Sequence, residues 1–359
     1  MQTIGCMVPP MSRTDRLEND LERGFTLLEE GALEEAAAIV ARCKRIDRRH
    51  EGVISLGAAV ADAQGDTEEA LAQYHALIEL HPDDAAPRIA VARLELHDVG
   101  DPDAALVTLD AVTEFIDDES DLIDAVMLRA EAYLARDEAP RAREALGELS
   151  SSVIDDPGLA LDLGELALAA EDPAAAVRWI DVARKAADAA VGEDAATADE
   201  VRADALHLLG RVHEAKEEKA EMLAAWAEVA KLDAASADAE VSISEDDLEA
   251  LAVGVLEELP PTVREKLANV PILIEDVPSA ALLAEGVDPR VLGLFSGTPM
   301  PEGGDLAPTV TNIHLFRKNL ERVARDEDHL AEEVRITVLH ETAHYFGLDE
   351  EELAAIGLD

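Results

Sequence analysis

Two histidines and a glutamate near the end of the chain have the types and the spacing of a metal-dependent hydrolytic site. His340, Glu341 and His344 form the pattern H-E-x-x-H. On an α-helix, residues four positions apart lie one turn apart on nearly the same face, so both imidazoles are predicted to face a single ion. Glu341 is rotated by about 100° from His340. It is therefore expected to lie beside the ion and to act as the general base towards an attacking water.

The residues after the second histidine supply candidates for a third ligand. A catalytic zinc takes three protein ligands and leaves a fourth position for water. Gly347 is predicted to end the helix in a left-handed conformation, which turns the chain back towards the histidines. Four acids follow, and carboxylate oxygen is an accepted zinc ligand: Asp349, Glu350, Glu351 and Glu352. Two histidines and one carboxylate also suit iron or manganese, so the donor set alone leaves the metal open.

The run from His340 to Glu350 resembles the extended zincin motif H-E-x-x-H-x-x-G-x-x-(H/D/E). Residues 242–359 resemble, more closely, a small bacterial family of minimal zincin-like metallopeptidases. The matching phrases are Leu256-Glu-Glu-Leu-Pro-Pro, Val270-Pro-Ile-Leu-Ile-Glu-Asp-Val-Pro-Ser and Arg335-Ile-Thr-Val-Leu-His-Glu. The resemblance implies a small zinc-site fold with one Zn²⁺ ion. It also implies Glu350 as the third ligand, with Asp349 as the alternative and Glu351 and Glu352 in solvent. No methionine follows the motif, so the methionine turn of the metzincins is absent.

The expected chemistry is hydrolysis of a peptide bond, with Glu341 taking a proton from water and returning it to the leaving amine. An oxyanion also has to be stabilised, and the candidates are Tyr345, His314 and Arg317. His314 lies in a predicted strand within residues 309–316, which is expected to be an edge along which a substrate lies extended. Packing or solvent exposure is the ordinary explanation for each of the three side chains.

Most of the preceding chain repeats with a period near 34 residues. A small alanine begins the second helix of each unit, after an acidic turn, and a larger apolar residue follows four positions later. The alanines are Ala36, Ala70, Ala105, Ala142 and Ala176, and the larger residues are Val40, Tyr74, Leu109, Leu146 and Ile180. This pattern resembles the tetratricopeptide repeat, and Gly65, Ala70, Tyr74 and Pro82 fit that family in one unit. An irregular sixth unit is predicted from Leu209-Gly210 and Trp226.

Stacked helix pairs of this kind form a superhelix with a concave face that usually binds peptides or protein segments. The lysines and asparagines with which some family members hold a terminal carboxylate are not seen here. An acidic groove favours a basic or apolar segment of a protein partner. A scaffold that only folds or self-associates is the alternative, and no oligomeric state is predicted.

The fold class predicted is mostly α, with a tetratricopeptide-like superhelix followed by a small α+β zincin-like domain. Residues 1–14 are predicted as a disordered leader in which Met11 is an alternative start, 15–235 as about six repeats, 236–245 as a linker and 246–359 as the metal domain. Within that domain we expect helices at 244–259, 262–268, 317–326, 328–346 and 350–356. Strands are expected at 270–275 and 309–316. Residues 278–305 are expected to be a loop with one short helix near 279–284.

Composition limits the partners and the compartment. The net charge of −49 argues against binding to nucleic acid and to anionic membranes. Two cysteines, Cys6 and Cys43, are too few for a disulfide framework and suit a reducing cytoplasm. Cys43 falls in a helical apolar pattern and is predicted to be core. No run of 18 apolar residues predicts a transmembrane helix.

Two functions follow from these patterns. The first is a cytoplasmic zinc-dependent metallopeptidase whose repeats recruit or orient a protein substrate. The second is a protein-interaction adaptor whose zincin-like module binds metal but is inactive.

Overall fold

The structure is a computed structural model that describes residues 12–113, 115–190, 195–236, 239, 241–267, 270–297 and 312–347. Their contacts form two compact units. The first unit contains Met1–Ile154 and Asp162–Ala176, and the second contains Asp155–Leu161 and Val177–Asp359. Of the predicted leader, residues 1–11 lie outside the described residues, and the Ser12 side chain caps the first helix by accepting a hydrogen bond from the Asp15 N–H.

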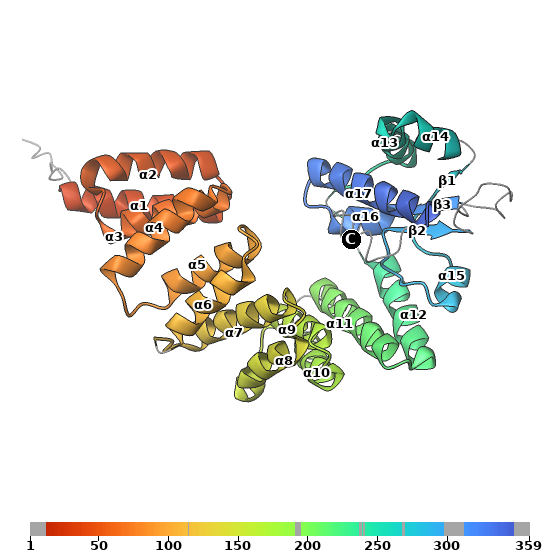
Figure 1. The fold of residues 1–359 in the computed structure, drawn as a ribbon, viewed down its shortest axis with the longest axis horizontal. Coiled ribbons are helices and arrows are strands. Elements are labelled where there is room, and N and C mark those ends of the chain that lie inside the picture. Colours follow the sequence, from red (N-terminus) through yellow and green to blue (C-terminus); the bar gives the residue numbers. More distant parts are fainter. Residues whose placement is uncertain are drawn as a thin grey trace, which may run out of the picture. The chain divides into compact units, whose positions relative to one another are not determined.

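Helices run from residue 13 to residue 190, and those up to residue 146 follow one another in antiparallel pairs (Figure 1). The helices are α1 (Arg13–Glu29), α2 (Leu33–Asp47), α3 (Glu51–Ala63), α4 (Thr67–Leu80), α5 (Ala86–His97), α6 (Pro102–Val112), α7 (Glu119–Leu134), α8 (Ala139–Leu146), the 3₁₀ helix η1 (Gly147–Ser151), α9 (Pro157–Ala169) and α10 (Pro173–Ala190). The second unit contains most of α10, from Val177 onward, and one more pair, α11 (Ala195–Ala215) and α12 (Lys219–Ala235).

Fully buried alanines hold the helix pairs together. All five predicted alanines have no exposed surface, and their small side chains allow two helices to approach closely: Ala36, Ala70, Ala105, Ala142 and Ala176. The turn inside each pair contains one residue with a left-handed backbone, at the same place in every pair. These residues are Gly31, Gly65, Gly100, Asp137, Glu171 and Glu217, with φ between 56° and 73°. The predicted tetratricopeptide-like helical fold is therefore confirmed, whereas the number of units stays a prediction.

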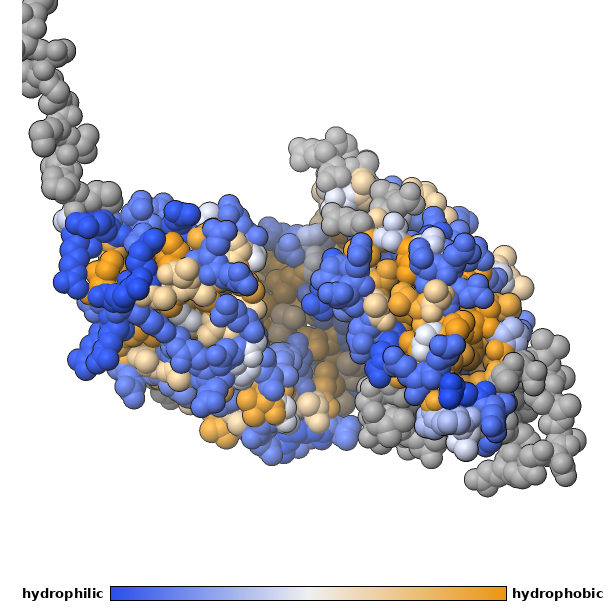
Figure 2. Space-filling view, turned by 90° about the horizontal axis from the view of Figure 1, so that it is seen from above, coloured by the Kyte–Doolittle hydropathy of each residue, from blue (hydrophilic) through white to orange (hydrophobic). Residues whose placement is uncertain are grey.

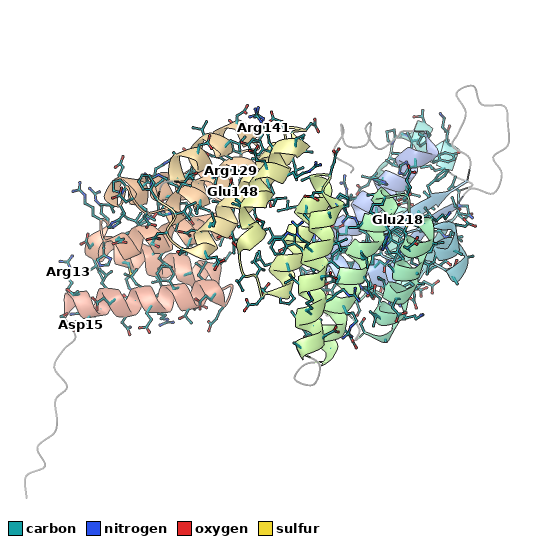
Figure 3. All side chains as sticks on the ribbon, turned by 90° about the horizontal axis from the view of Figure 1, so that it is seen from below. Arg13, Asp15, Arg129, Arg141, Glu148 and Glu218 are labelled. Carbon is teal, nitrogen blue, oxygen red and sulfur yellow. The ribbon has the colours of Figure 1, made fainter. Side chains whose placement is uncertain are left out.

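Charged side chains inside the repeats are paired. Arg129 of α7 is buried, and its Nη1 lies 3.1 Å from Glu148 of η1 (Figure 3). Its Nη2 donates to the Thr113 hydroxyl at 3.1 Å. A buried charge is tolerated only with such partners. Hydrophilic residues cover much of the surface that Figure 2 shows. Among the described residues, no helix combines the length and the apolar character needed to span a bilayer.

The second unit surrounds a small sheet with helices. After α12 come α13 (Glu245–Glu258), α14 (Pro261–Leu267), β1 (Ile272–Glu275), α15 (Ala280–Glu285), β2 (Gly293–Ser296), β3 (Asn312–Phe316), α16 (Arg317–Val323) and α17 (Glu327–Tyr345). The strand order is β1-β3-β2, with β1 parallel and β2 antiparallel to β3. The core joins α13, β3, α16 and α17 through Leu248, Ala252, Ile313, Leu315, Leu320, Leu330, Val334 and Val338.

The predicted helices and strands of this unit are found within a few residues of their expected ends, with two differences. Gly293–Ser296 lies in the expected loop but pairs with β3 as a strand. Asn312–Phe316 is therefore the central strand of this sheet, and β1 and β2 are the strands at its two edges. The predicted terminal helix at 350–356 lies outside the described residues. The predicted linker at 236–245 does not coincide with the boundary between the compact units, because α11 and α12 group with the elements that follow.

Candidate active site

Helix α17 carries the three motif residues and is fixed at both ends. The Asp326 side chain accepts a hydrogen bond from the His329 N–H at 2.8 Å and caps the helix start. At the other end Gly347 has φ of 83° and donates its N–H to the His344 carbonyl at 3.0 Å. Between these ends, Leu330, Val334 and Val338 are spaced one turn apart and pack into the core. This packing sets the rotation of the helix and hence the direction of the histidines.

The two histidine rings converge as their spacing predicts. Nε2 of His340 and Nε2 of His344 lie 2.9 Å apart, and the ring planes are inclined by 79°. Both rings are half-buried. A zinc–nitrogen bond is about 2.0–2.1 Å long, so two nitrogens at this separation are within reach of one ion. The imidazole donors, their separation and their partial exposure therefore fit a zinc ion.

Glu341 is held against strand β2. Its side chain is buried, and Oε2 accepts a hydrogen bond from the Phe295 N–H at 2.5 Å. The strand comes this close because Gly293 has no side chain. A Cβ added there would lie 2.5 Å from Thr337 Cγ2 and 3.0 Å from Glu341 Cγ. The carboxylate of the predicted base therefore lies beside the backbone of the sheet edge.

The structure does not describe the residues that are predicted to supply the third metal ligand. Asp349, Glu350, Glu351 and Glu352 follow Gly347 and lie outside the described residues. Among the residues that the structure does describe, no group of three His, Cys, Asp or Glu side chains could hold a metal ion. Glu350 as third ligand, with Asp349 as the alternative, therefore stays a prediction.

His314 lies on the sheet face away from α17. Its neighbours Ile313 and Leu315 pack in the core with α17, so the alternating His314 side chain is directed to the opposite face. There its Nδ1 lies 2.8 Å from Glu275 of β1, and its Nε2 lies 3.3 Å from the Ser296 hydroxyl of β2. The structure does not bring this predicted contact residue together with the two histidines.

The other two candidates for an oxyanion contact also have partners elsewhere. The Tyr345 hydroxyl donates to the Lys266 carbonyl at 3.3 Å, and burial raises the pKa of the phenol. Its ring packs edge-on against Phe295. Arg317 contacts Asp276, and its Nη1 lies 2.8 Å from Glu321. These contacts give both side chains a role in joining elements of the fold.

The contribution of β2 to the site is not evident from the sequence. Its backbone N–H at Phe295 contacts the predicted base, and a backbone group leaves no side-chain signal. The nearest signal is Gly293, a glycine before the apolar pair Leu294 and Phe295, since glycine in a strand often marks close approach of another element.

Comparisons with known protein families find one similar family for the C-terminal part of the chain and another for the helical repeats. Residues 267–358 match the profile of the zincin-like metallopeptidase family, and residues 56–84 match that of the tetratricopeptide repeat. The chain thus combines a zincin-like module with tetratricopeptide repeats. Comparison with curated proteins gives no match.

The similar solved structures are repeat proteins. One is PilW, a widely conserved type IV pilus biogenesis factor, with 12% identity, a TM-score of 0.49, and 61% of this chain and 93% of that chain covered. A second is pilF of Pseudomonas aeruginosa, with 15% identity, a TM-score of 0.47, and 62% and 95% covered. A third is a tetratricopeptide repeat protein from Parabacteroides merdae, with 17% identity, a TM-score of 0.42, and 63% and 80% covered.

Proposed function

We propose that the chain is a zinc-dependent peptidase whose helical repeats bind the protein that it cleaves or a partner that delivers it. The observation that carries this proposal is the convergence of the two histidine rings of the motif. The Nε2 atoms of His340 and His344 lie 2.9 Å apart, and the next residue, Glu341, lies against a sheet edge. His340, His344 and Glu350 would hold one zinc ion, with Asp349 as the alternative to Glu350.

Glu341 performs the proton transfers in this proposal. When bound, the zinc ion supplies Lewis acidity, which lowers the pKa of water and polarises a peptide carbonyl. The Glu341 carboxylate takes one proton from the attacking water, and the water oxygen forms a bond to the carbonyl carbon. As the carbon–nitrogen bond breaks, Glu341 returns that proton to the leaving amine. The second proton of that water also passes to the amine, so the products are one carboxylate and one ammonium group, and all the atoms of the water are accounted for.

Strand β2 is where we place the substrate backbone. Antiparallel pairs alternate between hydrogen-bonded and non-bonded positions, and Phe316 donates to the Leu292 carbonyl. The backbone groups of Gly293 and Phe295 therefore point away from β3, towards the side of β2 on which no other described strand pairs. The hydrogen bond from Phe295 to Glu341 supports the view that this side faces the base. An extended peptide added to β2 would lie beside Glu341.

The repeats are proposed to bind a basic or apolar protein segment on their concave face. The net charge of −49 favours a basic partner and disfavours nucleic acid and anionic membranes. The two cysteines suit a reducing cytoplasm, which is the compartment we propose.

The test measures bound metal and cleavage of an unfolded protein for the wild type and for Glu341→Gln. We expect about one zinc ion per chain in both proteins, because Glu341 is not a proposed ligand. Cleavage should fall by about 10²–10⁴-fold in the variant, the usual contribution of a general base. Metal bound without cleavage by either protein would support the inactive adaptor instead. A chain that holds no stoichiometric metal and tolerates His340→Ala would contradict both functions.

A further inference from the structure

A half-buried arginine connects the segment before β2 to the helices α11 and α12. Arg290 lies between α15 and β2 and forms a two-pronged contact with Asp233 of α12. Its Nε donates to Oδ2 and its Nη2 to Oδ1, both at 3.0 Å. Its Nη1 donates to Asp204 of α11 at 2.6 Å. One side chain therefore joins both helices of the pair to the strand that contacts Glu341.

Other contacts at the same place repeat this connection. Asp288 accepts from His207 of α11 at 2.8 Å, and Lys219 of α12 donates to the Glu285 carbonyl at 3.3 Å. Arg322 of α16 contacts Asp233 at 2.5 Å. Helix α12 lies beside α15 (Figure 1). All these residues belong to the second compact unit.

The central pair is well enough shielded from water to be strong. The Asp233 side chain is 9% exposed and that of Arg290 is 17% exposed. Burial alone would raise the pKa of the Asp233 carboxyl, but hydrogen bonds from Arg290 and Arg322 outweigh it and hold that pKa below its usual value. Two-pronged contacts between arginine and carboxylate fix geometry as well as adding energy.

The path from Arg290 to the base is short. The carbonyls of Pro289 and Val291 accept from the Asn319 amide at 2.9 and 2.7 Å, which fixes the backbone on both sides of Arg290. Strand β2 begins at Gly293, whose backbone lies against Thr337 and Glu341. The Phe295 N–H then donates to Glu341.

We infer that Arg290 is a positioning residue for the hydrolytic site. By holding Asp233 and Asp204, it fixes the strand β2 at the distance from α17 at which Phe295 contacts Glu341. The pair α11–α12 thus belongs to the hydrolytic site and supports its substrate edge. The catalytic consequence rests on the proposed function, whereas the structural consequence does not.

The test replaces Arg290 by methionine in the full chain and measures hydrogen exchange of backbone amides. The amides of Leu294–Ser296 should exchange at least about tenfold faster, because β2 loses its attachment to α11 and α12. The amides of α17 around Val334 and the bound zinc should stay as in the wild type. The control is Arg335→Met, which makes the same charge change at a side chain that is 47% exposed and pairs with Glu332. It should leave exchange in β2 unchanged.

Unchanged exchange in β2 of a folded Arg290→Met protein would overturn the inference. If that variant does not fold, Asp204→Asn is measured in its place. This substitution removes the charge of only one partner of Arg290, at a side chain that is 40% exposed. It should speed the exchange of β2 by a smaller factor, and no change there would equally overturn the inference. With an active wild type, we also expect kcat/KM to fall by about 10²-fold in Arg290→Met. A wild type without cleavage would contradict the proposed function alone, because the exchange rates would still decide the role of Arg290.

Discussion

Replacement of Gly293 by alanine tests the close contact between β2 and α17. The new Cβ would lie 2.5 Å from Thr337 Cγ2, 3.0 Å from Glu341 Cγ and 3.2 Å from the His314 carbonyl oxygen. Carbon atoms in good contact are about 3.5–4.0 Å apart, so Thr337 has to retreat by about 1 Å. Thr337 is buried and branched at Cβ, which leaves it little freedom to do so.

The expected loss of stability follows from two opposing terms. Overfilling a packed site costs about 1–3 kcal/mol, whereas alanine for glycine restricts the unfolded chain and returns about 0.4–1 kcal/mol. With the middle of each range, the net loss is about 1.3 kcal/mol. With a denaturant slope of about 2 kcal/mol per molar urea, the midpoint should fall by about 0.5–1 M. Tryptophan fluorescence reports the unfolding of the second compact unit, because both tryptophans of the chain, Trp179 and Trp226, lie in it.

The matched control is Gly254→Ala in α13, where an added Cβ meets nothing within 4 Å. Alanine in place of a helical glycine should stabilise the unit by about 0.5–1 kcal/mol. The two variants make the same chemical change and are expected to shift the midpoint in opposite directions. A midpoint for Gly293→Ala equal to or above that of the wild type would show that β2 and α17 are not packed as described.

Three further predictions concern the repeats. Gly210→Ala should lower the urea midpoint of the second unit by a similar amount, since its Cβ would lie 2.0 Å from Trp226 Nε1, and a midpoint equal to or above that of the wild type would contradict this. Burial raises the pKa of Tyr74 to about 12. The contribution of this side chain to the stability of the first unit should therefore be fully present below pH 10 and be lost as the pH rises through about 12. Ultraviolet titration of the wild type and of Tyr74→Phe should show that one tyrosine, missing from the variant, ionises that late. Burial likewise raises the pKa of the Cys43 thiol. In a Cys6→Ser protein, where Cys43 is the remaining thiol, reaction with a disulfide reagent should therefore proceed at the rate of unfolding. An immediate reaction would show that Cys43 is not buried.

The repeats could be predicted in detail because their contacts are local. Each alanine and its partner residue lie within one helix pair, so a pattern of small and larger residues at fixed spacing is enough to place them. The alanines Ala36, Ala70 and Ala105 are fully buried as their positions predict. The turn residues follow the same logic, although Asp137 and Glu171 adopt the left-handed backbone without being glycine. Asp137 and Glu171 lie in the acidic turns that precede their alanines.

The sheet edge could not be predicted, because its contacts are distant in sequence. Gly293–Ser296 is four residues long and shows no alternation that separates it from the surrounding loop. It becomes a strand by pairing with β3 and by packing on α17, and neither partner is near in the chain. The face on which His314 lies depends on that register, since a shift by one residue would reverse it. The spacing of His340 and His344 is informative because both lie on one helix.

The arginines of the second unit explain how so acidic a chain folds around a small core. The chain contains 79 aspartates and glutamates but only 30 lysines and arginines, so more than two carboxylates are present for each basic side chain. Arg290 contacts two aspartates, Arg317 contacts Asp276 and Glu321, and Arg322 shares Asp233 with Arg290. Removing one such arginine would leave carboxylates partly buried without a compensating charge, which destabilises the fold by more than the ion pair itself stabilises it. These three arginines therefore serve as internal connections between elements.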